Sequence, residues 1–101
     1  MSIDLRNINE YPYIKTFSVD TSTKQIQLPG EARTIKIGSE ALILYVAQNG
    51  ATDGGVLPAD RVFIPANNIL PIKLGIGLQR KNIFVATKSG TGSATIMLEE
   101  Q

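Results

Sequence analysis

The residues that could do chemistry in this chain are its carboxylates, because the sequence contains no histidine and no cysteine. Their absence excludes imidazole and thiolate metal sites, disulfides, and every catalytic pair of a nucleophile with histidine. General acid–base catalysis would need two carboxylates in one shaped site, and the spacing of Asp53 and Asp60 is compatible with a glycosidase pair. Nothing else around them predicts a cleft, so we interpret both as solvated loop charges.

The same loop contains Asp53-Gly54-Gly55, which could suggest a calcium site because hard cations bind clustered oxygen ligands. It lacks the alternating Asp or Asn ligands and the closing glutamate of a calcium-binding loop. An Asp-Gly pair is also common in turns. We therefore predict a turn here, no bound metal, no cofactor, and a protein that is not an enzyme. The role of the whole loop from Gln48 to Asp60 stays open, because long loops in small domains are often functional or mobile.

Length and charge limit the possible partners. The 101 residues are 43% hydrophobic and 19% charged, with a net charge of +1, which suits a single domain with one core. The basic and acidic residues are scattered along the chain, so no nucleic-acid surface is predicted. No apolar run reaches the roughly 18–20 residues of a transmembrane helix, so no membrane partner is predicted either.

Residue types and spacing predict a sheet protein. Ile, Val and Thr outnumber Leu, Ala and Met, and many glycines and prolines divide the chain into short segments. Strands are expected at residues 13–19, 24–28, 33–37, 42–47, 61–64, 69–74, 82–87 and 93–98. About eight short antiparallel strands can form two sheets packed face to face. The predicted fold class is therefore all-β, an antiparallel β-sandwich or jelly roll.

Two local signals refine this prediction. Pro65 and Pro71 cannot donate to a strand ladder, so their strands are expected to lie at sheet edges or to begin there. The segment from Ser39 to Gln48 has two interpretations, because it begins like a capped helix and is followed by Asn49-Gly50, a typical helix stop. Its apolar core contains β-branched and aromatic residues and no polar stripe, so we favour a strand.

We divide the chain into an extended N-terminal arm, residues 1–12, and a single β-sandwich domain, residues 13–101. The arm carries apolar side chains among polar ones, and the strand at 42–47 is apolar on both faces. These features are typical of a protein that works by binding other proteins. The candidate partner contacts are Ile3, Leu5, Ile8, Tyr11, Tyr13, Ile43 and Tyr45. The face with Ile43 and Tyr45 could be covered in one of two ways, by another part of the same domain or by an oligomeric interface.

Several segments between Gln25 and Glu99 together form a recognisable pattern. They are Leu28-Pro29-Gly30, Thr34-Ile35-Lys36-Ile37, Leu42 to Val46, Leu57-Pro58-Ala59 to Ile64-Pro65-Ala66, Ile69 to Leu74, and the ending Asn82-Ile83-Phe84-Val85-Ala86 to Ser89-Gly90-Thr91-Gly92-Ser93-Ala94-Thr95-Ile96-Met97-Leu98. In these segments the chain resembles small bacteriophage virion proteins, especially head-decoration or cement proteins with β-sandwich folds.

This resemblance implies a non-enzymatic capsid decoration protein, often a trimeric homo-oligomer, that binds the major capsid protein or other virion proteins and stabilises the outer shell. Its location would be the virion, after assembly in the host bacterial cytoplasm, which the lack of cysteine suits. The alternatives on the same fold are a tail, baseplate or neck subunit, a host-surface binding module and, more remotely, an oligonucleotide-binding barrel.

Docking is expected to order the arm, while many identical contacts on a lattice supply avidity. Deletion of Met1 to Glu10 is then expected to abolish particle binding and to leave the fold intact.

Overall fold

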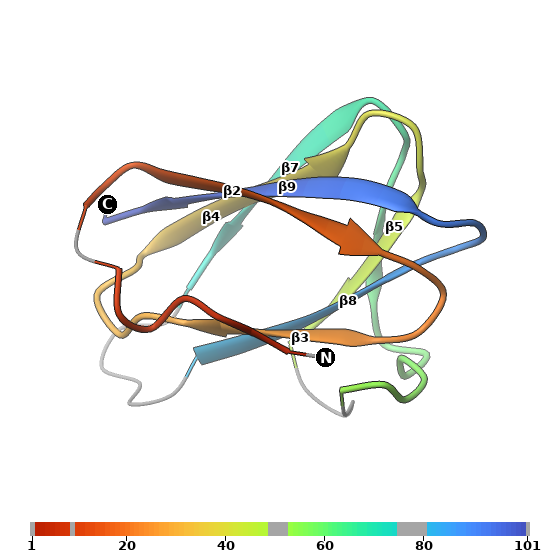
Figure 1. Cartoon of the computed structure of the whole chain (residues 1–101), viewed down its shortest axis with the longest axis horizontal. Helices are drawn as coiled ribbons and strands as arrows, with labels where there is room; N and C mark the ends of the chain where they lie inside the picture. Colours follow the sequence, from red (N-terminus) through yellow and green to blue (C-terminus); the bar gives the residue numbers. More distant parts are fainter. Residues whose placement is uncertain (1, 9, 49–52, 75–80, 101) are drawn as a thin grey trace.

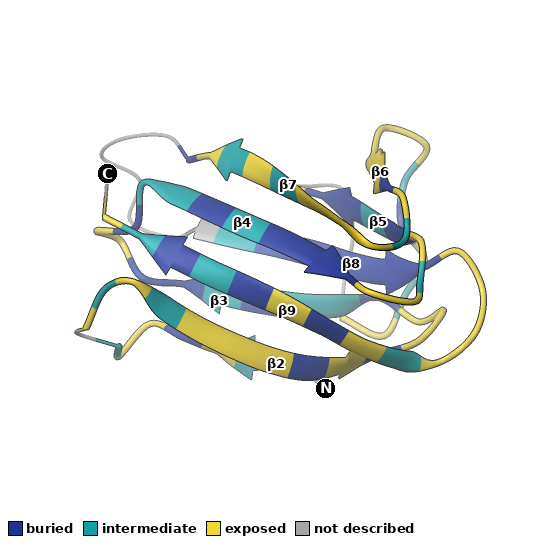
Figure 2. Cartoon of the chain, turned by 90° about the horizontal axis from the view of Figure 1, so that it is seen from above, coloured by how far each residue is buried: buried dark blue, intermediate teal, exposed yellow. Residues whose placement is uncertain are grey.

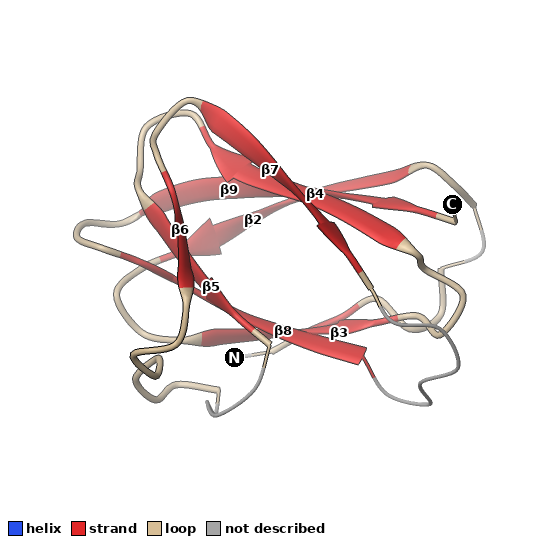
Figure 3. Cartoon of the chain, turned by 180° about the vertical axis from the view of Figure 1, so that it is seen from behind, coloured by secondary structure: helices blue, strands red, loops and turns tan. Residues whose placement is uncertain are grey.

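The computed structural model describes residues 2–8, 10–48, 53–74 and 81–100, and these residues form two packed sheets without a helix (Figure 1, Figure 3). The strands are β1 (Ile3–Asp4), β2 (Tyr13–Val19), β3 (Lys24–Leu28), β4 (Thr34–Ser39), β5 (Leu44–Ala47), β6 (Val62–Ile64), β7 (Asn68–Lys73), β8 (Lys81–Thr87) and β9 (Gly92–Glu99). The predicted all-β sandwich is confirmed. Each predicted strand is present, with ends that differ by no more than two residues.

The strand order is that of a jelly roll. One sheet has the order β1-β3-β8-β5-β6 and the other the order β2-β9-β4-β7. The antiparallel pairs β2–β9, β3–β8, β4–β7 and β5–β6 are nested one inside the next, and successive pairs alternate between the two sheets. The chain from β2 to β9 is therefore one long hairpin rolled into two layers. Of the two architectures left open by the sequence, this pairing selects the jelly roll.

The core lies between the sheets because apolar residues alternate with polar ones along most strands. Figure 2 shows this alternation along β9, where Ala94, Ile96 and Leu98 are buried and Thr95 is exposed. Burying each large aliphatic side chain of this kind contributes roughly 1.5–3 kcal/mol to folding. The inward faces predicted from the sequence are confirmed for this strand and for Phe17, Val19, Ile26, Leu28, Ile35 and Ile37.

Residues 2–8 belong to the sandwich, which corrects the expectation of a separate N-terminal arm. β1 pairs in parallel with the edge of β3, and the N–H of Leu5 continues this pairing by donating to the carbonyl of Gln27 at 2.8 Å. Leu5 is 4% exposed and lies in the main core. Its burial explains why this short segment stays on the sheet, since an edge strand of two residues has few hydrogen bonds of its own.

The segment from Ser39 to Gln48 forms a turn and then strand β5, as favoured over a helix. The capping hydrogen bond that the sequence suggested is present, because the N–H of Leu42 donates to Oγ of Ser39 at 3.3 Å. This hydrogen bond closes the turn that carries the chain from one sheet to the other. The proline predictions are also confirmed, since Pro71 lies in edge strand β7 and Pro65 directly follows edge strand β6.

Candidate functional site

The carboxylates do not assemble into a metal centre in the part of the chain that the structure describes, where no group of three or more potential ligands occurs. Asp53-Gly54-Gly55 forms a turn, and hydrogen bonds attach this turn to Thr23 and to the first residues of β3. Oδ1 of Asp53 accepts the N–H of Gln25 at 2.9 Å, and this hydrogen bond lowers the pKa of Asp53. Backbone bonds join Gly54 N–H to the carbonyl of Thr23 at 2.7 Å and Thr23 N–H to the carbonyl of Gly55 at 3.1 Å. The predicted turn is thus confirmed.

The edge strands carry features that oppose pairing with a strand of another chain. β1 has two residues and β6 has three, which is too short for a stable added ladder. In β2, Lys15 lies opposite the fully buried Ile96, so this edge strand carries an exposed lysine in its inward-facing row. In β7, Pro71 has no N–H to donate. These features disfavour the addition of a strand from another chain at these edges. Among the described residues there is also no helix long and apolar enough to cross a membrane.

The predicted contact residues fall into two groups. Ile3, Ile8, Tyr11 and Tyr13 are half-buried against the core of their own chain, together with the buried Leu5. Ile43, directly before β5, is 36% exposed, and Tyr45 of β5 is half-buried. The neighbouring outward residue of β5, Ala47, packs with Leu57 from the loop before β6. A cover from the same domain is therefore confirmed for this end of the strand.

One exposed cluster combines aromatic rings with a guanidinium group. Phe63 of β6 lies directly opposite Tyr45 of β5, so both side chains are on the outer face of the five-stranded sheet. The Phe63 side chain is 66% exposed. Cζ of Arg61 lies 4.1 Å from the centroid of the Tyr45 ring, a cation–π contact that holds the guanidinium against the ring. We call Tyr45, Arg61 and Phe63 the aromatic patch.

The composition of the aromatic patch is that of a protein-binding hot spot. Tyrosine and arginine are enriched at such sites, and aromatic residues in general are enriched at interfaces, because they combine a large apolar area with few rotatable bonds. The partner contacts predicted from the sequence include Tyr45 but neither Phe63 nor Arg61. The available signal was Pro65, which marks the strand as an edge. On an edge strand the outward residue has fewer neighbours to cover it.

Comparison with known proteins provides no relative from which a function could be transferred. No protein-family model matches the chain, and neither a curated protein nor a solved structure does.

Proposed function

We propose that this protein is a non-enzymatic structural protein of a bacteriophage virion, a capsid decoration protein that binds the major capsid protein through the aromatic patch. The observation that carries the proposal is the exposed Phe63 ring beside Tyr45, with Arg61 stacked on Tyr45. The jelly roll supports it as a fold-level analogy, because viral capsid domains often have this fold. As a decoration protein it forms a homo-oligomer, a trimer, on the virion.

This docking surface differs from the N-terminal residues that the sequence suggested as the partner contact. Leu5 is already buried in the core of its own chain, so it has no surface left for a partner. Phe63 does have such surface. With 66% of its side chain exposed, full burial would contribute roughly 3 kcal/mol at about 25 cal/mol per Å². One patch alone gives modest affinity, and repeated copies on a lattice would turn it into stable attachment.

The location is tested by quantitative mass spectrometry of purified particles from the source phage, scaled to the major shell protein. A copy number comparable to that of the shell protein supports decoration. A few copies per particle would instead point to a tail, baseplate or neck subunit, and absence from the particles would contradict a virion role altogether.

The docking surface is tested by co-sedimentation of purified variants with undecorated particles. Phe63→Ala is expected to weaken attachment at least tenfold per contact, from the roughly 3 kcal/mol of burial that it removes. Ile14→Ala is the matched control, because Ile14 is 62% exposed but lies on the outer face of the other sheet. Both side chains are largely exposed, so neither change should unfold the domain. Normal decoration by Phe63→Ala would contradict the aromatic patch as the docking site.

A further inference from the structure

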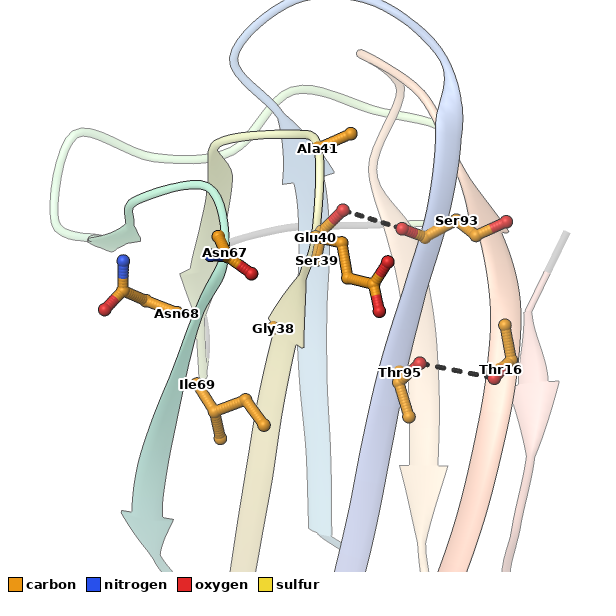
Figure 4. Close-up of a pocket in the computed structure, with 10 residues that line it drawn as sticks. All are labelled: Thr16, Gly38, Ser39, Glu40, Ala41, Asn67, Asn68, Ile69, Ser93 and Thr95. Atoms are coloured by element: carbon orange, nitrogen blue, oxygen red, sulfur yellow. Dashed lines mark hydrogen bonds between the residues drawn. The ribbon is translucent and has the colours of Figure 1, made fainter.

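A pocket of about 670 Å³ opens on the four-stranded sheet, away from the aromatic patch (Figure 4). Its lining includes one outward cross-strand row that contains a glycine. The paired residues of this row are Thr16, Thr95, Gly38 and Ile69. A Cβ atom on Gly38 would overlap the carbonyl oxygen of Asn68, so only glycine fits there. Between Thr95 and Ile69 the row therefore has no side chain, and the Asn68 carbonyl lies where the Cβ of residue 38 would be.

Buried Ser39 holds the walls of this pocket together. Its Oγ donates to the carbonyl of Ser93 at 2.7 Å and accepts the N–H of Leu42 at 3.3 Å. Its own carbonyl accepts the N–H of Asn67 at 2.7 Å. These three bonds connect the end of β4, the turn before β7 and the start of β9. The pocket is therefore preformed, as small-molecule sites usually are.

Several polar side chains line this pocket. Figure 4 shows the Glu40 carboxylate and the Asn67 side chain on opposite sides of Gly38, and both residues are exposed. Within the described residues neither side chain makes a hydrogen bond to the protein. The hydroxyls of Thr16 and Thr95 lie 3.2 Å apart beside them. The site thus offers a carboxylate acceptor, an amide that can both donate and accept, and hydroxyls that can do either.

The charges and apolar atoms of the lining narrow the ligand class. Among the described residues no lysine or arginine lines the pocket, so a phosphate or carboxylate ligand would find no counter-charge there and would be repelled by Glu40. The described lining contains no aromatic ring either, which disfavours a stacked nucleobase. Ile69 is 68% exposed at the rim and offers an apolar surface. A ligand that fits is neutral, rich in hydroxyl groups and apolar on one ring face.

We propose that this pocket binds a neutral pyranose sugar, as a unit of a polysaccharide. Glu40 accepts hydrogen bonds from sugar hydroxyls, Asn67 donates to and accepts from its neighbours, and Ile69 packs against the C–H face of the ring. The site lies on the other sheet from the aromatic patch, so the proposal is independent of capsid binding.

The test is a titration of the ¹⁵N-labelled full chain, followed by amide chemical shifts, with glucose, galactose, mannose, N-acetylglucosamine and their oligomers. We expect saturable shifts confined to amides that line the pocket, with a Kd on the order of 1 mM for one small sugar. Glu40→Gln should weaken binding roughly tenfold, because it replaces a charged acceptor. Asn67→Gly should also weaken it, and glycine tolerates the left-handed backbone at this position, where φ is 62°.

The matched control is Glu100→Gln, which makes the same change at an exposed site beyond the opposite end of β9. It should bind sugar like the unmodified chain. Three results would overturn the proposal. They are the absence of saturable shifts up to about 100 mM sugar, unchanged affinity in both pocket variants, or tighter binding of glucuronate or phosphate than of neutral sugars. The amide spectrum of each variant shows directly whether the fold is retained.

Discussion

Replacing Gly38 by alanine should strongly destabilise the fold, because the backbone of β7 occupies the space that a side chain would need. A Cβ at this position would overlap the carbonyl oxygen of Asn68 and lie 3.1 Å from both the carbonyl carbon of Asn68 and Cα of Ile69. These are backbone atoms, so no rotation of a side chain can relieve the overlap. The variant must push β7 away from β4 where Gly38 pairs with Ile69.

The expected cost follows from two contributions. Overpacking a well-packed site costs about 1–3 kcal/mol, and disturbing one or two ladder hydrogen bonds costs about 1 kcal/mol each. Alanine gains back roughly 0.5–1 kcal/mol because it loses less backbone freedom than glycine in a strand. We expect Gly38→Ala to lower the free energy of unfolding by about 3 kcal/mol. With a urea m value of about 1.5 kcal/mol/M, the unfolding midpoint should fall by roughly 2 M.

Gly92→Ala is the matched control for this measurement. Its Cβ would lie 2.8 Å from Cδ1 of Leu42, the far end of a flexible side chain that can move aside. We expect a loss below about 1 kcal/mol for this variant. If urea unfolding shows the two variants within about 0.5 kcal/mol of each other, the rigid approach of β7 over Gly38 is refuted.

Three further predictions use the same unfolding assay. Leu5→Ala should lower the free energy of unfolding by about 2–3 kcal/mol, because Leu5 is 4% exposed and lies in the core. An unchanged stability would show that residues 2–8 form an arm separate from the sandwich. Thr23→Val should raise the free energy of unfolding by roughly 1 kcal/mol, because the Oγ1 of Thr23 is buried without a hydrogen-bond partner in the described structure and valine has nearly the same shape. A lower free energy of unfolding would mean that this hydroxyl has a stabilising partner. Burial and the nearby Glu31 carboxylate raise the pKa of Tyr11 from 10.0 to about 12. Because the folded pKa lies above the unfolded one, this contribution to stability is complete below pH 10 and is lost as the pH rises toward 12. Tyr11→Phe should show a smaller decline between those pH values, and identical declines in both proteins would contradict the shift.

The strands and most of the core were predictable because alternation is a local property. Ala94, Ile96 and Leu98 alternate with polar residues, and this is enough to assign their face before any neighbour is known. β1 was not predictable, since a strand of two residues has no period of its own. It exists because β3 offers an edge and the core accepts Leu5.

The candidate sites show where this local information ends. Val62, Phe63 and Ile64 are all apolar, so their sequence does not reveal which side faces water. Ile64 is 2% exposed and Phe63 66%, because the second sheet covers only the inward face of β6. The pairing with Tyr45 that completes the aromatic patch likewise depends on the β5–β6 register.

By itself, then, the sequence determined the all-β class, the strand positions and the inward-facing core, because residue type and period act within a few neighbouring residues. Only the tertiary structure decided that Gly38 lies beneath the backbone of Asn68 and that Glu40 and Asn67 flank one depression. It also decided that Phe63 stays exposed while Leu5 is buried. These outcomes depend on which strands pair across the nested hairpin, and residues far apart in the chain meet only when both sheets have formed.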